Sequence, residues 1–168
     1  MRLIAERLWL TTTRLVAIRI DEKVLSNTWW PVATYAEGVS ETVLDRIMAL
    51  WFNCSLGLLS LIAARVDTRG AWVDHKKPVL EELLVLDPRG LSEAVRDDLC
   101  REFDEVQRLE LLSLPHIAVD EVRGRIDTAI ARALGVDDDF SMYRRLLAAE
   151  PLLSGHLPAS AVSRPAAW

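Results

Sequence analysis

The chain has 168 residues, of which 51% are hydrophobic, and it carries a net charge of −5 and two cysteines. This length predicts one domain, or one domain with a helical appendage, and the hydrophobic fraction is sufficient for a buried core. The composition excludes a strongly basic protein. Because Cys54 and Cys100 form no CxxC pair, we expect core thiols of a reduced cytoplasmic protein rather than a disulfide.

The acidic excess lies entirely in the second half of the chain. Residues 1–90 carry eleven Lys/Arg and eleven Asp/Glu, whereas residues 91–168 carry nine and fourteen. A local face of the first half therefore remains a candidate for nucleic-acid binding. Charged residues throughout the first twenty positions predict no signal peptide, and we expect no membrane contact.

The first ninety residues combine short strands with one long helix. Extended segments are predicted, in chain order, at 2–9, 14–20, 24–32, 71–74 and 84–86. The first two are predicted to form a hairpin, with three threonines in the connection between them. A single helical turn, 79–83, is expected after Pro78, because proline suits the first position of a helix.

The long helix is predicted from Ser40, its N-cap, to about Ala64. Its apolar residues nearly encircle it, which indicates burial on most sides. Asp45, Arg46 and Asn53 interrupt the apolar run, so it is too short to span a bilayer. Gly57 costs about 1 kcal/mol relative to alanine inside a helix, and we expect it to allow close approach of another backbone.

The second half predicts amphipathic helices. Ser92 begins one that runs to about Glu110, and Gly135 ends another, 119–134. A third helix, 140–149, follows three aspartates that suit a helix start. We therefore predict an α+β fold, with a small mixed sheet packed on a long buried helix and a C-terminal helical segment. The expected divisions are an α+β unit at 1–90, a helical extension at 91–153 and a flexible tail at 154–168.

Motifs of catalysis are missing from the sequence. It contains neither a P-loop nor a GxGxxG loop, and His75, His116 and His156 do not pair with the cysteines at zinc spacing. A nucleotide methyltransferase would need a glycine-containing donor loop and a polar–Pro-Pro–aromatic tetrad, and neither occurs. The sequence thus predicts no catalytic residue, no metal site and no cofactor, and we expect the chain not to be an enzyme.

The candidate functional residues form a short basic turn with an aromatic neighbour. These residues are Arg69, Trp72, His75, Lys76 and Lys77. Cationic side chains suit phosphate contact, and an aromatic ring suits base stacking. The alternative is a sheet-edge strand whose charges are simply solvated.

A tryptophan pair, Trp29 and Trp30, gives a second candidate surface, for DNA or for a protein partner. We expect one ring to pack in the core and the other to be displayed. The sequence alone does not distinguish which ring does which.

The order of several short motifs resembles a known family. These motifs are Ser-Asn-Thr-Trp-Trp-Pro-Val, Leu-Trp-Phe-Asn-Cys-Ser-Leu-Gly, Arg-Gly-Ala-Trp, Lys-Lys-Pro and Leu-Glu-Glu-Leu-Leu-Val-Leu-Asp-Pro. Over residues 1–153 the chain is similar to the C-terminal target-recognition region of N6-adenine-specific DNA methyltransferases of restriction–modification and phage-defence systems. In that family, Ser-Thr or Ser-Lys stands in place of Cys54-Ser55, and Leu-Pro in place of Leu84-Val85.

The resemblance implies DNA recognition without methyl transfer, because the N-terminal catalytic domain of such enzymes is missing from this sequence. The implied partners are double-stranded DNA and a methyltransferase or defence-complex chain. The chain would be either a fragment of a larger enzyme or a stand-alone subunit. A second hypothesis is a protein–protein adaptor with little DNA contact, which the acidic second half favours.

Overall fold

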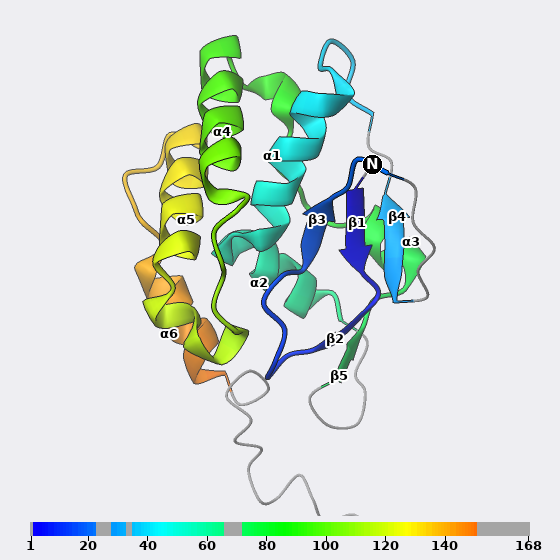
Figure 1. Cartoon of the computed structure of the whole chain (residues 1–168), viewed down its shortest axis with the longest axis vertical. Coiled ribbons are helices and arrows are strands. Elements are labelled where there is room, and N and C mark those ends of the chain that lie inside the picture. The colour runs from blue at the N-terminus through cyan, green and yellow to red at the C-terminus, as the bar shows by residue number, and fades with distance from the viewer. Residues whose placement is uncertain (1, 23–27, 33–34, 66–71, 151–168) are drawn as a thin grey trace, which may run out of the picture.

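The computed structural model describes residues 2–22, 28–32, 35–65 and 72–150. Five short strands and six α-helices make up most of this part of the chain (Figure 1). In chain order the strands and helices are β1 (Arg2–Ala5), β2 (Arg7–Trp9), β3 (Ala17–Arg19), β4 (Trp29–Val32), α1 (Glu41–Asn53), α2 (Ser55–Ala63), β5 (Trp72–Asp74), α3 (Lys77–Glu81), α4 (Glu93–Val106), α5 (Glu121–Ala133) and α6 (Ser141–Ala149), with 3-10 turns η1 (Pro88–Gly90) and η2 (Leu114–Val119). The α+β class is confirmed.

The main sheet has the strand order β3-β1-β4. The middle strand β1 is fully buried, and its Ile4 pairs with Ala17 of β3 and with Trp30 of β4. All described ladders are antiparallel, whereas we expected a mixed sheet. The predicted hairpin is present in the β1–β3 pairing.

The chain leaves this sheet at Glu6 and begins a second one. The Glu6 amide donates to the Thr28 carbonyl, while its own carbonyl accepts from the amide of His75 (both 2.9 Å). Residues 7–9 then pair with β5, not with β3, and form a two-stranded ribbon. Figure 1 shows this β2–β5 ribbon at the lower edge of the molecule.

The prediction of one long helix from 40 to 64 is wrong in one respect. The segment forms two helices, which meet at Cys54 with a bend of 72°. Cys54 has an extended backbone (ψ 165°), and its Sγ caps the amide of Gly57 at 3.4 Å. A side chain at Gly57 would place Cβ 2.0 Å from the carbonyl oxygen of Trp51. The expected close backbone approach is therefore real, and the approaching backbone is the end of α1. No single described helix is long and apolar enough to cross a membrane; α1 and α2 would qualify only as a bent pair.

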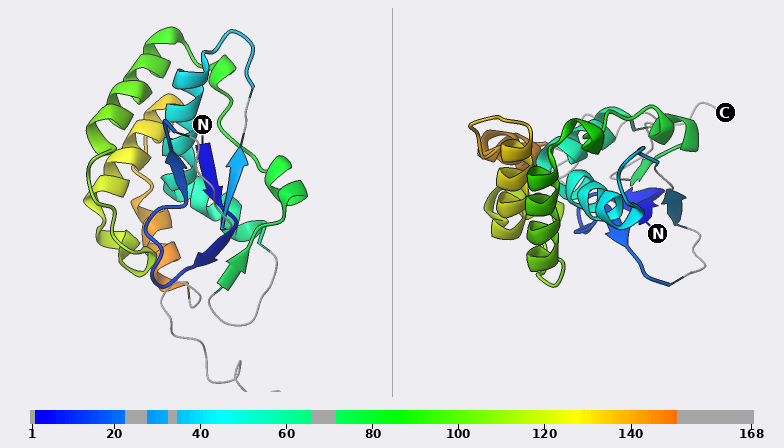
Figure 2. Two further views of the ribbon diagram at one scale, coloured as in Figure 1. Left: turned by 45° about the vertical axis from the view of Figure 1, so that its right-hand side comes forward. Right: turned by 90° about the horizontal axis from the view of Figure 1, so that it is seen from above.

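Helices α4, α5 and α6 cover the side of α1 and α2 away from β4 (Figures 1 and 2). The predicted caps are confirmed: Ser92 Oγ accepts from Val95 N, and Gly135 has φ +70°. Helix α4 ends at Val106 rather than at residue 110. One hydrophobic cluster runs from Ile4 to Leu147, so the core is continuous across residue 90.

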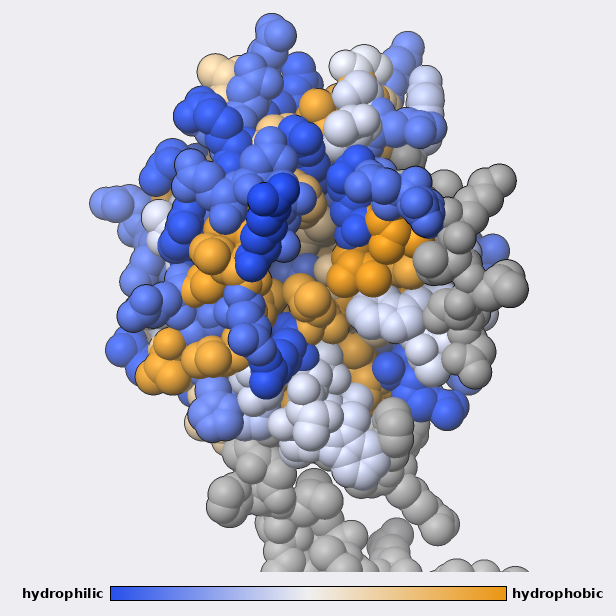
Figure 3. All heavy atoms as spheres, viewed as in Figure 1, coloured by the Kyte–Doolittle hydropathy of each residue, from blue (hydrophilic) through white to orange (hydrophobic). Residues whose placement is uncertain are grey.

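The segment 84–86 is not a strand, contrary to the prediction. Leu84 is 83% exposed, and no described strand pairs with the segment. The segment connects α3 to η1, and α3 itself begins at Lys77, earlier than predicted. On the face shown in Figure 3, hydrophobic surface forms separate patches over the helices and over β1 and β4, among hydrophilic residues.

Candidate functional site

The predicted basic turn continues directly from the β2–β5 ribbon. Trp72 pairs with Trp9 in the ladder, and Arg7 pairs with Asp74. Of Trp72 only the backbone is described, and Arg69 lies outside the described residues. The position of the ribbon is thus established, whereas the contacts of these two predicted side chains are not.

Lys76 and Lys77 are exposed side by side where β5 passes into α3. Lys76 is the N-cap residue of α3, and its extended backbone turns the chain into the helix. The ammonium of Lys77 lies 3.8 Å from the Glu81 carboxylate, and both side chains are largely in water. Such an exposed ion pair is weak, so Lys77 can be recruited by an external anion.

Arg7 adds a further cation to this end of the molecule. Its Nε donates to Asp74 Oδ1 at 2.8 Å. This hydrogen bond lowers the pKa of Asp74 and raises that of Arg7. The ribbon therefore carries charge of both signs, and Lys76 and Lys77 follow the end of β5.

His75 does not belong to an exposed site, and this corrects the prediction. It is only 1% exposed, and its Nε2 lies 3.2 Å from the carbonyl oxygen of Leu61 in α2. Its backbone carbonyl accepts from the indole Nε1 of Trp30 at 3.3 Å. Burial lowers the pKa of the imidazole. His75 thus ties the end of β5 to α2 and β4, and it positions the lysines that follow without reaching solvent.

The two tryptophans of β4 are both half-buried, whereas we expected one core ring and one displayed ring. Trp29 packs against the hydrophobic core. Trp30 instead lines a surface groove and donates to His75 as described. The structure therefore brings together Trp30, His75 and Lys77, three of the residues singled out in the sequence.

The groove beside Trp30 has a volume of about 590 Å³. We call it the β4–α3 groove, because those elements form its two sides; Figure 2 shows α3 beside β4. Its lining is apolar apart from two charged side chains on α3. The lining residues are Ile4, Trp30, Pro31, Val32, Met48, Phe52, Lys77, Leu80, Glu81, Leu83 and Val85.

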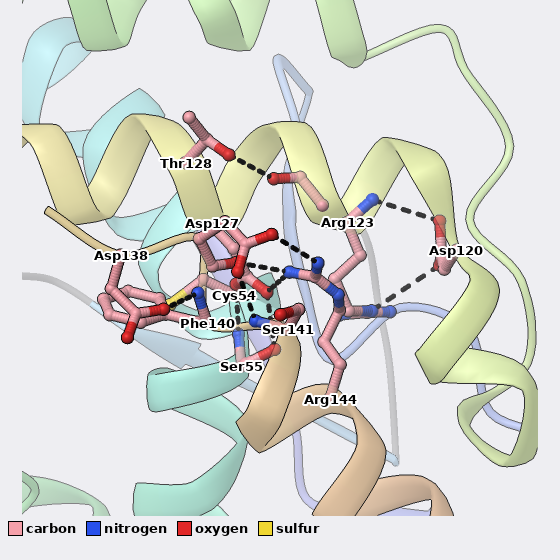
Figure 4. A network of polar contacts seen from close by, with 12 residues as sticks. Cys54, Ser55, Asp120, Arg123, Asp127, Thr128, Asp138, Phe140, Ser141 and Arg144 are labelled. Atoms are coloured by element: carbon pink, nitrogen blue, oxygen red, sulfur yellow. Dashed lines mark hydrogen bonds and ion pairs between the residues drawn. The ribbon is translucent and has the colours of Figure 1, made fainter.

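A buried ionic network lies at the first turn of α2, and sequence reasoning missed it (Figure 4). The carboxylate of Asp127 in α5 accepts from the amide and the hydroxyl of Ser55, both at 2.7 Å, and from Arg144 Nη1 at 2.6 Å. Burial raises the pKa of Asp127, although the bonds from Ser55 and Arg144 oppose this. Asp127 thereby caps the first turn of α2 and holds α6 against it.

A second buried arginine completes this network. Arg123 is fully buried; it donates to the carbonyls of Asn53 and Arg14 and lies beside Asp120. The usable sequence signal was the spacing of Arg123 and Asp127, four residues apart on the face of α5 that also carries Ile126 and Ile130. These groups are engaged with one another and with backbone, which indicates a structural role.

The described residues provide no evidence for a nucleophilic catalytic site or a metal site. No group of three or more His, Cys, Asp or Glu among them is placed to hold a metal ion. Burial raises the pKa of the Cys54 thiol to about 12 and also raises that of Cys100. Neither thiol is therefore activated as a thiolate.

Comparison of the chain with protein-family models, with curated proteins and with solved structures finds no match. The resemblance to methyltransferase target-recognition regions stays a prediction from the sequence motifs.

Proposed function

We propose that the chain is a non-catalytic DNA-recognition module that works with a separate DNA methyltransferase or defence-complex chain. The observation that carries this proposal is the β2–β5 ribbon. It is hydrogen-bonded apart from the main sheet, and exposed Lys76 and Lys77 follow it directly. A two-stranded ribbon has the dimensions that the major groove of double-stranded DNA admits.

The exposed face of the ribbon carries suitable side chains. Arg7 and Trp9 are exposed, whereas Leu8 between them is buried in the core. Cationic groups here would contact phosphates and set the register, and side chains nearer the bases would carry the sequence preference. Buried His75 fixes where the two lysines emerge, which makes their spacing to the ribbon reproducible.

A second function, a protein–protein adaptor, is favoured by the β4–α3 groove. Nine of its eleven lining residues are apolar, a composition that suits protein side chains better than phosphates. Asp74 and Glu81 also offset part of the positive charge of Arg7 and Lys77. The adaptor would use the groove with little DNA contact.

The Lys76→Ala/Lys77→Ala double variant separates the two functions. Binding of a labelled DNA duplex is measured by fluorescence anisotropy over a series of salt concentrations, with the chain in the assembly with which it purifies. Loss of two phosphate contacts should weaken binding to every duplex alike and reduce the slope of log K against log salt by roughly 2.

The matched control is Arg101→Ala/Arg145→Ala, which removes two exposed cations from α4 and α6. We expect this control to keep the wild-type salt slope. An unchanged affinity and slope in the lysine variant would contradict the DNA contact proposed here. Loss of a protein partner instead of DNA would favour the adaptor.

A further inference from the structure

We propose that the β4–α3 groove binds an amphipathic helix of a partner protein. An acidic side chain of that helix would lie beside Lys77, and a basic side chain one turn along would lie beside Glu81. This inference goes beyond DNA recognition, because it assigns the partner chain to the β4–α3 groove, which shares Lys77 with the proposed DNA contact, and it states the chemistry of the segment that fits there.

The interior of the groove calls for apolar side chains. Its floor and walls come from β1, β4, α1, α3 and the segment that follows α3, and they include the ring of Trp30. The volume of about 590 Å³ lies within the usual range of ligand-binding pockets and is large enough for several side chains. Apolar side chains placed here would leave water and gain contacts on more than one side, which is the mode of helix-in-groove recognition.

The two charged residues at the rim of the groove add an electrostatic requirement to the apolar one. Lys77 and Glu81 are the only charged residues among the described residues of the lining, and they stand four residues apart on α3. Their side chains are 70% and 65% exposed, and the 3.8 Å contact between them leaves both with capacity for a further partner. A matching segment therefore carries one acidic and one basic side chain. If it carried two charges of the same sign, one of the two would lie beside a residue of like charge, either Lys77 or Glu81.

The spacing of these charges is compatible with a helix as the occupant. Four residues of helix rise about 6 Å, so residues i and i+4 of a helix lying along α3 match the separation of Lys77 and Glu81. The same i, i+3, i+4 and i+7 positions place apolar side chains on a single face. One helix face can thus supply both the apolar anchors and the charge pair.

Two designed helical peptides serve as probes, each with the same leucine stripe. One carries Glu and Lys one turn apart beside the stripe, and the other carries Glu at both positions. We expect the full chain to bind the Glu/Lys peptide about threefold more tightly or better, as for a partly exposed charge pair, measured by fluorescence anisotropy. The Glu/Lys peptide matches only in the direction that places its Glu beside Lys77 and its Lys beside Glu81, so a version with the two charges exchanged is also measured, and the tighter of the two is compared with the Glu/Glu peptide.

Matched variants of neighbouring residues test the position of binding. Val85 lines the groove and Leu84 does not, although both are exposed. Val85→Asp should weaken both peptides about tenfold or more, because it places a charge among apolar groups, whereas Leu84→Asp should leave binding unchanged. Glu81→Lys should reverse the preference in favour of the Glu/Glu peptide, and Glu82→Lys, outside the lining, should not.

Binding of neither peptide, equal effects of Val85→Asp and Leu84→Asp, or a preference unaltered by Glu81→Lys would each overturn the proposal. Concentration-dependent self-association that Val85→Asp abolishes would assign the groove to a second copy of the chain and would also overturn it. Duplex binding is measured separately on the same variants. A failure to bind DNA would therefore count against the proposed function and leave the groove result intact.

Discussion

Replacing Asp127 by alanine should be among the most damaging single changes in this protein. The carboxylate is fully buried and accepts from Ser55 N, Ser55 Oγ and Arg144 Nη1 at 2.6–2.7 Å. Its removal leaves the guanidinium of Arg144, only 10% exposed, with one charged partner fewer, and it leaves the Ser55 amide in the first turn of α2 without its acceptor. Breaking a buried ion pair costs about 3–5 kcal/mol, and the cap loss of about 0.5–2 kcal/mol overlaps with it.

The loss is measured as the change in free energy of unfolding in urea, with the slope m fitted for each variant. Asp127→Asn keeps the size and one acceptor oxygen, so its loss should be smaller, about 1–3 kcal/mol. The control, Asp98→Ala, removes an ion pair whose Arg101 side chain is 72% exposed, and it should change stability by less than about 1 kcal/mol. A loss below about 1 kcal/mol for Asp127→Ala would refute the assignment of Asp127 as the buried link between α2, α5 and α6.

Three further predictions follow from single residues. Burial lowers the pKa of His75, so the unfolded chain binds more protons, and stability should fall as the pH drops below about 6.5; a urea midpoint that stays constant from pH 8 to about 5.5 would contradict this. Gly57→Ala should destabilise by about 1–3 kcal/mol in urea unfolding, because Cβ would meet Trp51 O, whereas Gly124→Ala, with ordinary 3.6 Å contacts, should be neutral or stabilising. Cys54, with a pKa of about 12, should react with iodoacetamide only on unfolding, and stoichiometric labelling of the native chain would count against its burial.

The features that the sequence predicted correctly are those encoded locally. Ser40 and Ser92 cap the helices that follow them, and Gly135 takes the left-handed conformation that ends α5. Each of these signals is a side chain or a backbone preference that acts within three residues. The α+β class followed from the same short-range patterns, because strands and helices differ in hydrophobic period.

The bend at Cys54 was missed because its cause is distant in sequence. The residues from Trp51 to Leu56 are all compatible with a continuous helix. What stabilises the new helix start is the Asp127 carboxylate on the Ser55 amide, 72 residues away. A pattern within one segment carries no information about such a contact.

The prediction of the candidate site was wrong in part for the same reason. His75 precedes two lysines, which indicated an exposed basic turn, but its burial depends on the carbonyl of Leu61 and on the sheet. The β4–α3 groove draws its lining from five separate parts of the chain, so no local motif marks it. Of the predicted DNA-binding side chains that the structure describes, Lys76 and Lys77, whose exposure needs no tertiary partner, were placed correctly in solvent.

These contacts make α2 one connection between the helical segment and the candidate site. At its first turn, Ser55 is held by Asp127, and through it by Arg144 of α6. Near its last turn, the carbonyl oxygen of Leu61 lies 3.2 Å from Nε2 of His75, the residue directly before the two lysines. Buried polar contacts at both ends of this short helix therefore link α5 and α6 to the residue that precedes Lys76. The helical extension is therefore better understood as part of the support for the β2–β5 ribbon than as a separate appendage.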